Sequence, residues 1–124
     1  MPIDALELAR SHAFGRTVFG AGLLLAPGLV GALWVGAPAD RPGGQVLAMA
    51  MGARDLALGL GTYAALRGRG AARPWIRAGI VADAADLVAT VRHRDDLPGA
   101  SVPLVAAMAA SSVALGAWLQ ATLD

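Results

Sequence analysis

Five charged residues stand inside otherwise apolar segments, and their types are those that acid–base chemistry uses: Arg16, Arg54, Asp55, Asp83 and Asp86. Asp83 and Asp86 are three positions apart and therefore share one face of a helix. If all five are ionised, three carboxylates face two guanidinium groups, and in a low-dielectric site this excess favours a proton on one carboxyl. A protonated carboxyl beside an ionised one can act in general acid–base catalysis or in proton-coupled transport.

These residue types lead to definite candidate roles. We expect Asp55 and Asp86 to form the acid–base pair and Asp83 to be an auxiliary carboxylate. Arg54 and Arg16 would hold charge and orient the polar end of a substrate. The alternative is that these ion pairs only keep two helices in register. The scheme requires no metal and no cofactor, because two interspersed Arg residues disfavour a cation among the carboxylates.

Ser112 is a further substrate-orienting candidate. It shares a small, polar helix face with Ala109, Gly116 and Gln120. Its hydroxyl could equally bond to the backbone of its own helix, so a packing role stays open. The absence of Cys excludes disulfides, thiolate catalysis and Cys-based metal centres.

Four apolar stretches must position these residues, at about 11–35, 46–66, 75–92 and 101–123. Segments rich in Gly, Pro and charge separate them, which predicts helices and an all-α fold. A stretch of 21 residues forms a helix of about 31 Å, close to the ~30 Å hydrocarbon core of a bilayer. Charged residues make up 15% of the 124-residue chain, where about 25% is usual in soluble domains. We expect one domain, residues 1–124, forming an integral membrane four-helix bundle that crosses the plasma membrane several times.

The connection between the second and third stretches carries Arg67, Arg69, Arg73 and Arg77 without an acid. The positive-inside rule therefore places this connection, and both termini, in the cytoplasm. A cleaved signal peptide ending near Ala37-Pro38-Ala39 is the alternative for the N-terminal segment, although its apolar run is long for a signal. Pro27 should kink the first helix.

Buried charge sets how the second and third helices should meet. An Asp or Arg at a helix centre costs about 2.5–3.5 kcal/mol on insertion scales, so we expect the two helices to insert as a pair with their charges facing each other. The face of Gly52, Asp55, Gly59 and Thr62 is small enough to admit a close neighbour.

The remaining polar and aromatic residues indicate where the helices lie in the membrane and assign no reaction. His12 and His93 are expected near opposite membrane faces, and Trp34, Trp75 and Trp118 near helix ends as interface anchors. The ten basic residues are all Arg and are dispersed along a chain of net charge +1, which argues against a nucleic-acid partner.

The segment Gly52-Ala53-Arg54-Asp55-Leu56-Ala57-Leu58-Gly59, followed by Asp83 and Asp86, resembles a family of small four-helix membrane proteins of actinobacteria that carry a G-x-R-D-x-x-L-G motif. The likeness covers most of the chain. It implies a membrane-embedded helical bundle and assigns no activity. The Asp–Arg–Asp grouping is also similar in chemistry to the set used by limonene-epoxide-hydrolase-like enzymes, which have another fold.

The sequence supports two hypotheses in which the charged residues act on a bound or transported molecule, and a third in which they are only structural. The leading hypothesis is a protein that binds a lipophilic small molecule from the bilayer and carries out acid–base isomerisation, cyclisation or epoxide opening. The alternative is a proton-coupled transporter that acts as a homodimer. The third is an assembly subunit in which the ion pairs are structural. A closed cavity with converging carboxylates would favour the first, and saturated pairs without a cavity the last.

Overall fold

A computed structural model describes residues 4–123, and every element within them is helical. In chain order these are α1 (Ala5–Leu25), α2 (Pro27–Val35), η1 (Ala37–Asp40), α3 (Pro42–Ala64), η2 (Ala65–Arg69), α4 (Ala72–Arg92), η3 (Arg94–Asp96) and α5 (Ser101–Thr122). The all-α prediction is confirmed, and the three later stretches lie within a few residues of α3, α4 and α5. Residues 1–3 and 124, at the two termini, lie outside the described residues.

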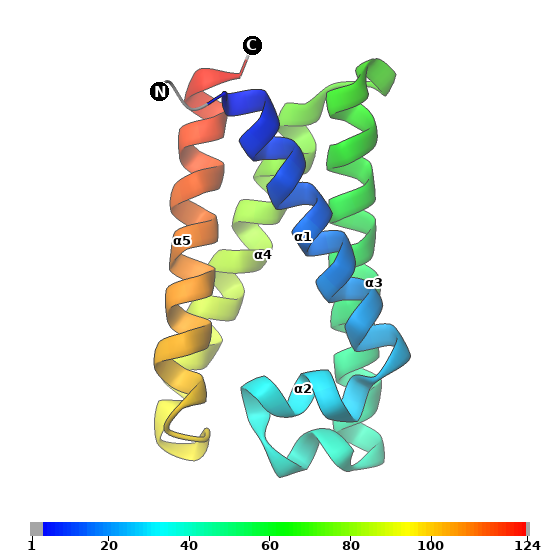
Figure 1. Ribbon diagram of the computed structural model, residues 1–124. Coiled ribbons are helices and arrows are strands. Elements are labelled where there is room, and N and C mark those ends of the chain that lie inside the picture. Colours follow the sequence, from blue (N-terminus) through cyan, green and yellow to red (C-terminus); the bar gives the residue numbers. More distant parts are fainter. Residues whose placement is uncertain (1–3, 124) are drawn as a thin grey trace.

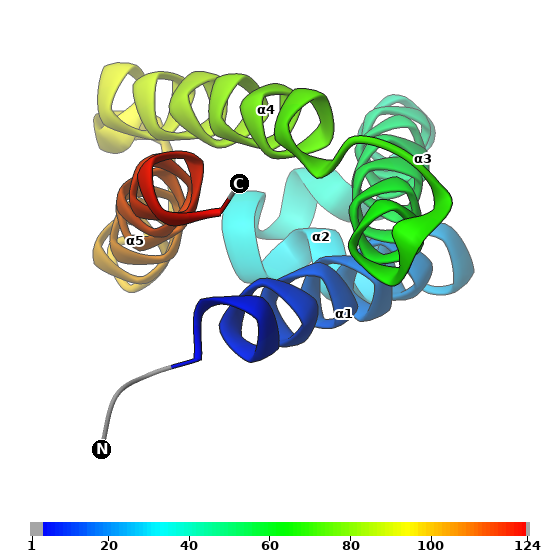
Figure 2. The same cartoon turned by 90° about the horizontal axis from the view of Figure 1, so that it is seen from above.

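The four long helices run alongside one another, and the short α2 crosses one end of the bundle (Figure 1). Seen from above, α1 lies against α3, and α4 lies against α5 (Figure 2). The beginning of α1, the α3–α4 connection and the end of α5 occupy the end opposite α2. The interior is therefore enclosed by two helix pairs, with α2 across one end.

The predicted single helix over residues 11–35 is wrong, because the chain turns sharply between Leu25 and Pro27. Helices α1 and α2 meet at 112°, far more than a kink. Ala26 leaves helical geometry (φ −139°, ψ 63°), as expected for a residue that precedes proline. Pro27 then begins α2, where its missing N–H costs nothing. The result is a helix that lies across the bundle end instead of continuing α1.

Close approach of α1 and α3 depends on glycine. A Cβ atom at Gly52 would lie 2.8 Å from the backbone oxygen of Gly20 and 2.8 Å from Cβ of Leu23. The small face that contains Asp55 thus packs against α1. The close neighbour expected for this face is α1, while Arg54 of the same helix forms the ion pair with Asp86 of α4.

The two ends of the bundle are closed differently. At the end where α1 begins, Ala9, Ile76 and Leu119 form an apolar cluster that joins α1, α4 and α5. Nearby, Arg73 and Gln120 exchange two hydrogen bonds of 2.6 Å between side chains and backbone oxygens. At the other end α2 provides the closure.

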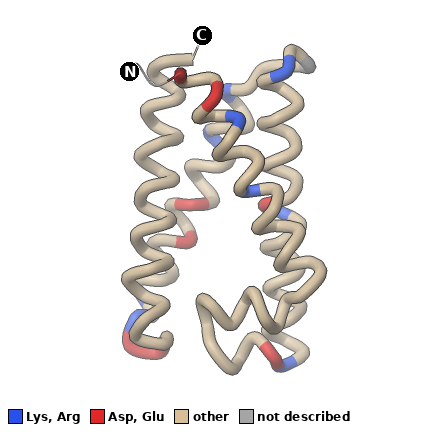
Figure 3. Tube along the Cα trace, in the orientation of Figure 1, with Lys and Arg blue, Asp and Glu red and all other residues tan. Residues whose placement is uncertain are grey.

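The outer surface of the bundle is strongly apolar. Sixteen large hydrophobic side chains are at least 40% exposed, among them Leu25 at 87% and Leu29 at 76%. Nine hydrophobic residues are buried among those described, and six of them are Ala. Large apolar side chains thus lie mainly outside, whereas charged groups of α1, α3 and α4 lie midway along the bundle (Figure 3).

Among the described residues one helix, α5, is long and apolar enough to cross a membrane on length and composition. Helices α1 and α2 satisfy the same criterion only together, and they are bent by 112°. In α3 and α4 the charged residues at mid-helix lower the mean hydropathy. The number of membrane crossings predicted from the four stretches therefore stays a prediction.

Candidate functional site

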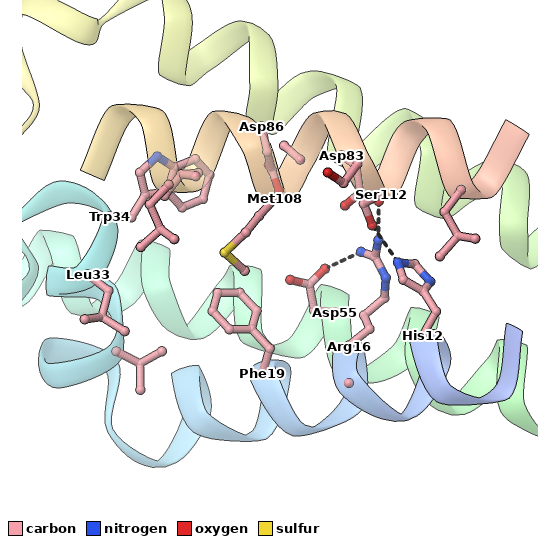
Figure 4. A pocket seen from close by; sticks show the side chains of 17 residues that line it. His12, Arg16, Phe19, Leu33, Trp34, Asp55, Asp83, Asp86, Met108 and Ser112 are labelled. Carbon is pink, nitrogen blue, oxygen red and sulfur yellow. Dashed lines mark hydrogen bonds and ion pairs between the residues drawn. The ribbon is translucent and has the colours of Figure 1, made fainter. Parts of the chain in front are cut away.

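Arg16 joins three helices inside the bundle through ion pairs. Its Nη1 donates to Asp55 Oδ1 at 2.9 Å, and its Nη2 donates to Asp83 Oδ2. The side chains of Arg16, Asp55 and Asp83 are 9%, 5% and 10% exposed. Arg16 of α1 thereby links α3 to α4 across the interior (Figure 4).

Arg54 extends this chain of ion pairs to Asp86. Its Nη1 and Nη2 donate to the two carboxylate oxygens of Asp86 at 2.9 and 2.7 Å, and its Nε donates to Asp55 Oδ1 at 3.3 Å. A two-pronged Arg–carboxylate pair of this kind is strong and directional. The order of charges is thus Asp83, Arg16, Asp55, Arg54 and Asp86, alternating in sign; we call these five residues the charge chain.

The carboxylates of the charge chain differ in how many of their oxygens accept a hydrogen bond. Both oxygens of Asp86 accept from Arg54. Among the described residues, hydrogen bonds reach one oxygen of Asp55 and one of Asp83. In Figure 4 the second oxygen of Asp55 points into the open space beside Phe19 and Met108. Asp55 and Asp83 therefore each keep one oxygen that can accept a hydrogen bond from a ligand, whereas both oxygens of Asp86 already accept from Arg54.

A cavity of about 570 Å³ lies against the charge chain, between the α1–α3 and α4–α5 pairs. Its polar wall contains Arg16, Asp55, Asp83 and Asp86 with His12, Ser111 and Ser112; the other lining residues are Gly15, Phe19, Val30, Leu33, Trp34, Leu104, Val105, Met108, Ala109 and Leu115. The volume is that of a small-molecule site, and the mixture of an apolar wall with a few convergent polar groups is typical of one.

Five of the six predicted site residues line this one cavity. They are Arg16, Asp55, Asp83, Asp86 and Ser112. Arg54 is outside the lining and reaches the site through its contacts with Asp55 and Asp86. Their chemical roles stay predictions. Among the described residues, no group of three His, Asp or Glu side chains is arranged to hold a metal ion.

His12 is a cavity residue that sequence reasoning placed at a membrane interface. Its Nε2 shares a hydrogen bond of 2.6 Å with Ser112 Oγ (Figure 4). Thr17, Thr62, Thr90 and Thr122 instead donate to carbonyl oxygens of their own helices. Ser112 therefore contacts His12 of α1, and a packing role and a substrate-orienting role both stay open for its hydroxyl. The signal that could have found His12 is its position four residues before Arg16, which puts both on one helix face.

Trp34 also lines the cavity, although its position near a helix end predicted an interface anchor. Its Nε1–H donates to Thr90 Oγ1 at 2.9 Å, and Thr90 in turn donates to the backbone oxygen of Asp86. Thr90 is 1% exposed. The contact fastens α2 to α4 and fixes the end of the cavity.

Together the fold and the site define a small helical bundle with a charge-lined internal cavity and an apolar exterior. Comparison with protein-family models, with curated proteins and with solved structures found no match to this chain.

Proposed function

We propose that this chain is an integral membrane protein that binds a lipophilic small molecule in the cavity beside the charge chain. The observation that carries this proposal is the cavity itself: about 570 Å³, mostly apolar, and bordered on one side by buried ionised groups. Ion pairs that only hold helices together do not require an empty cavity beside them. Sites of this size and lining usually hold small molecules.

Its apolar exterior supports a membrane location. Soluble monomers rarely expose apolar patches beyond a few hundred Å², whereas Leu25, Leu29 and Val81 are each at least 69% exposed here. Charged groups lie in the interior, as intramembrane ionisable residues do. A bilayer would cover the exposed side chains and leave the cavity as the polar site within it.

The cavity also supports acid–base chemistry on the bound molecule. Asp55 presents an oxygen to the cavity, and Arg16 holds the same carboxylate from the other side. A general acid or base must have such an oxygen within reach of its substrate. Asp83 also lines the cavity and has one oxygen without a hydrogen bond among the described residues, which favours Asp55 with Asp83 as the reacting pair. Asp86, held at both oxygens, would position Arg54.

Membrane topology can be tested by single-cysteine labelling, because the natural chain contains no Cys. Ala71→Cys and Gly99→Cys place thiols at exposed positions in opposite end connections; at Gly99 an added Cβ meets nothing within 4 Å. An impermeant maleimide should label Gly99→Cys on intact cells and Ala71→Cys only after permeabilisation, because the Arg-rich connection stays in the cytoplasm.

Unaltered protein, which has no thiol, is the background control for this labelling. Extraction of the chain from membranes by alkaline carbonate would contradict the membrane proposal. Equal labelling of both positions on intact cells would contradict the predicted topology.

Ligand binding can be tested by mass spectrometry of small molecules that copurify in mild detergent. Asp55→Asn should reduce a specific retained lipophile by about tenfold or more, since it removes a charged hydrogen-bond acceptor at the cavity. Asp95→Asn is the matched control, because the Asp95 side chain is 90% exposed and is not among the residues that line the cavity. Retention of bulk lipid alone by the unaltered protein would refute the ligand-binding proposal.

A further inference from the structure

The cavity is polar on one side and apolar at its opening. Arg16, Asp55 and Asp83 lie within the bundle and are almost completely buried. By contrast, Leu33, Leu104 and Met108 also line the cavity but are 63%, 52% and 55% exposed. The cavity therefore opens sideways, between α2 and α5, through apolar side chains. An occupant that satisfies both ends is an amphiphile with its head inward and its tail toward this opening.

The inner wall of the cavity offers carboxylate oxygens to which no hydrogen bond is made among the described residues. Both Nη atoms of Arg16 and three nitrogens of Arg54 already donate to carboxylates. His12 and Ser112 are engaged with each other. The second oxygens of Asp55 and Asp83 are carboxylate acceptors without a hydrogen bond among the described residues, so a head group that donates can bind there.

The net charge of the charge chain restricts the chemical class of the head group further. The charge chain contains two guanidinium groups and three carboxylates, which sum to one negative charge. An uncompensated charge in a low-dielectric interior is costly. A proton on His12 would not be a favourable remedy, since Arg16 lies four residues further along the same face of α1 and like charges at this spacing repel. A proton on one carboxyl can neutralise the empty site, and a singly charged cation beside Asp55 could take the place of that proton.

We propose that the ligand is an amphiphile with one cationic amine head, which donates to Asp55 and Asp83, and an apolar tail directed toward Leu33 and Leu104. This inference rests on the proposed function and names the ligand class. A neutral hydroxyl head could also donate, but only the amine brings the positive charge that can replace a proton on a carboxyl.

Trp34 provides a reporter for occupancy, because it lines the cavity at the α2 end. We would substitute Trp75→Phe and Trp118→Phe, both more than a third exposed, so that Trp34 is the remaining tryptophan. The protein in zwitterionic lipid nanodiscs is then titrated with ω-bromododecylamine, ω-bromododecanol and ω-bromododecanoate. Bromine at the tail end quenches Trp34 only if the tail lies near α2.

The amine should quench Trp34 with an apparent Kd at least about tenfold below that of the alcohol, because its ammonium group adds an ion pair to the hydrogen bond with Asp55. The carboxylate should bind least. Asp55→Asn should abolish the preference for the amine and leave alcohol binding within about threefold, which also controls for partition into the lipid. Asp95→Asn should retain the preference.

The outcomes separate the two proposals. Equal binding of amine and alcohol, or tighter binding of the carboxylate, would overturn the cationic head and leave ligand binding intact. An amine preference that survives Asp55→Asn would overturn the assigned head-group site. Absence of quenching by all three probes, in a sample whose unfolding transition matches that of the unaltered protein, would refute the ligand-binding proposal as well.

Discussion

Arg16→Gln should destabilise the bundle by about 3–5 kcal/mol, since it removes one partner from a buried ion-pair network. The substitution leaves Asp55 without its 2.9 Å contact and Asp83 without its arginine. The charge chain would then hold three carboxylates and one guanidinium, so its sum changes from one negative charge to two. A lower midpoint of thermal or denaturant unfolding in detergent measures this effect.

Arg10→Gln is the matched control, because it makes the same change on the same helix. Arg10 pairs with Glu7 at the surface, where the two side chains are 34% and 65% exposed. Such a pair contributes about 1 kcal/mol or less. Adding Asp83→Asn to Arg16→Gln should recover part of the loss, because it removes one of the unpaired carboxylates. Equal destabilisation by Arg16→Gln and Arg10→Gln would show that the charge chain is not the tie between α1, α3 and α4.

Gly52→Ala should destabilise the protein by about 1–3 kcal/mol, the usual cost of adding a methyl group to a filled contact. The new Cβ would lie 2.8 Å from the Gly20 oxygen, so α1 would have to move away from α3. That displacement would also stretch the Arg16–Asp55 ion pair between the same helices. Ligand retention should fall together with stability, measured on the same sample.

Gly15→Ala distinguishes this clash from the ordinary effect of replacing a helical glycine. An added Cβ at Gly15 meets nothing within 4 Å. Helix propensity alone should therefore stabilise this variant by about 0.5–1 kcal/mol. We expect Gly52→Ala to lower the free energy of unfolding and Gly15→Ala to raise it. Stabilisation by both substitutions would contradict the close α1–α3 contact.

Helical content and the small faces follow from local patterns. Apolar stretches with Pro and Gly between them predict α3, α4 and α5 within a few residues, because helix limits depend on nearby residues. The face of Gly52 and Asp55 follows from helical periodicity. Its partner does not, since Gly20 on α1 matches it just as a residue of α4 could have done.

Sequence alone determined which side chains could do chemistry: charge in the middle of an apolar helix needs partners, and Arg16, Arg54 and three Asp residues are the ionisable groups that need them. Tertiary structure decided the rest. The turn at Ala26 places α2 across the bundle end, where Trp34 bonds to Thr90. The His12–Ser112 contact joins residues 100 positions apart. Such pairings depend on how whole helices cross, and the energies of many weak contacts between helices set that crossing, which no short pattern encodes.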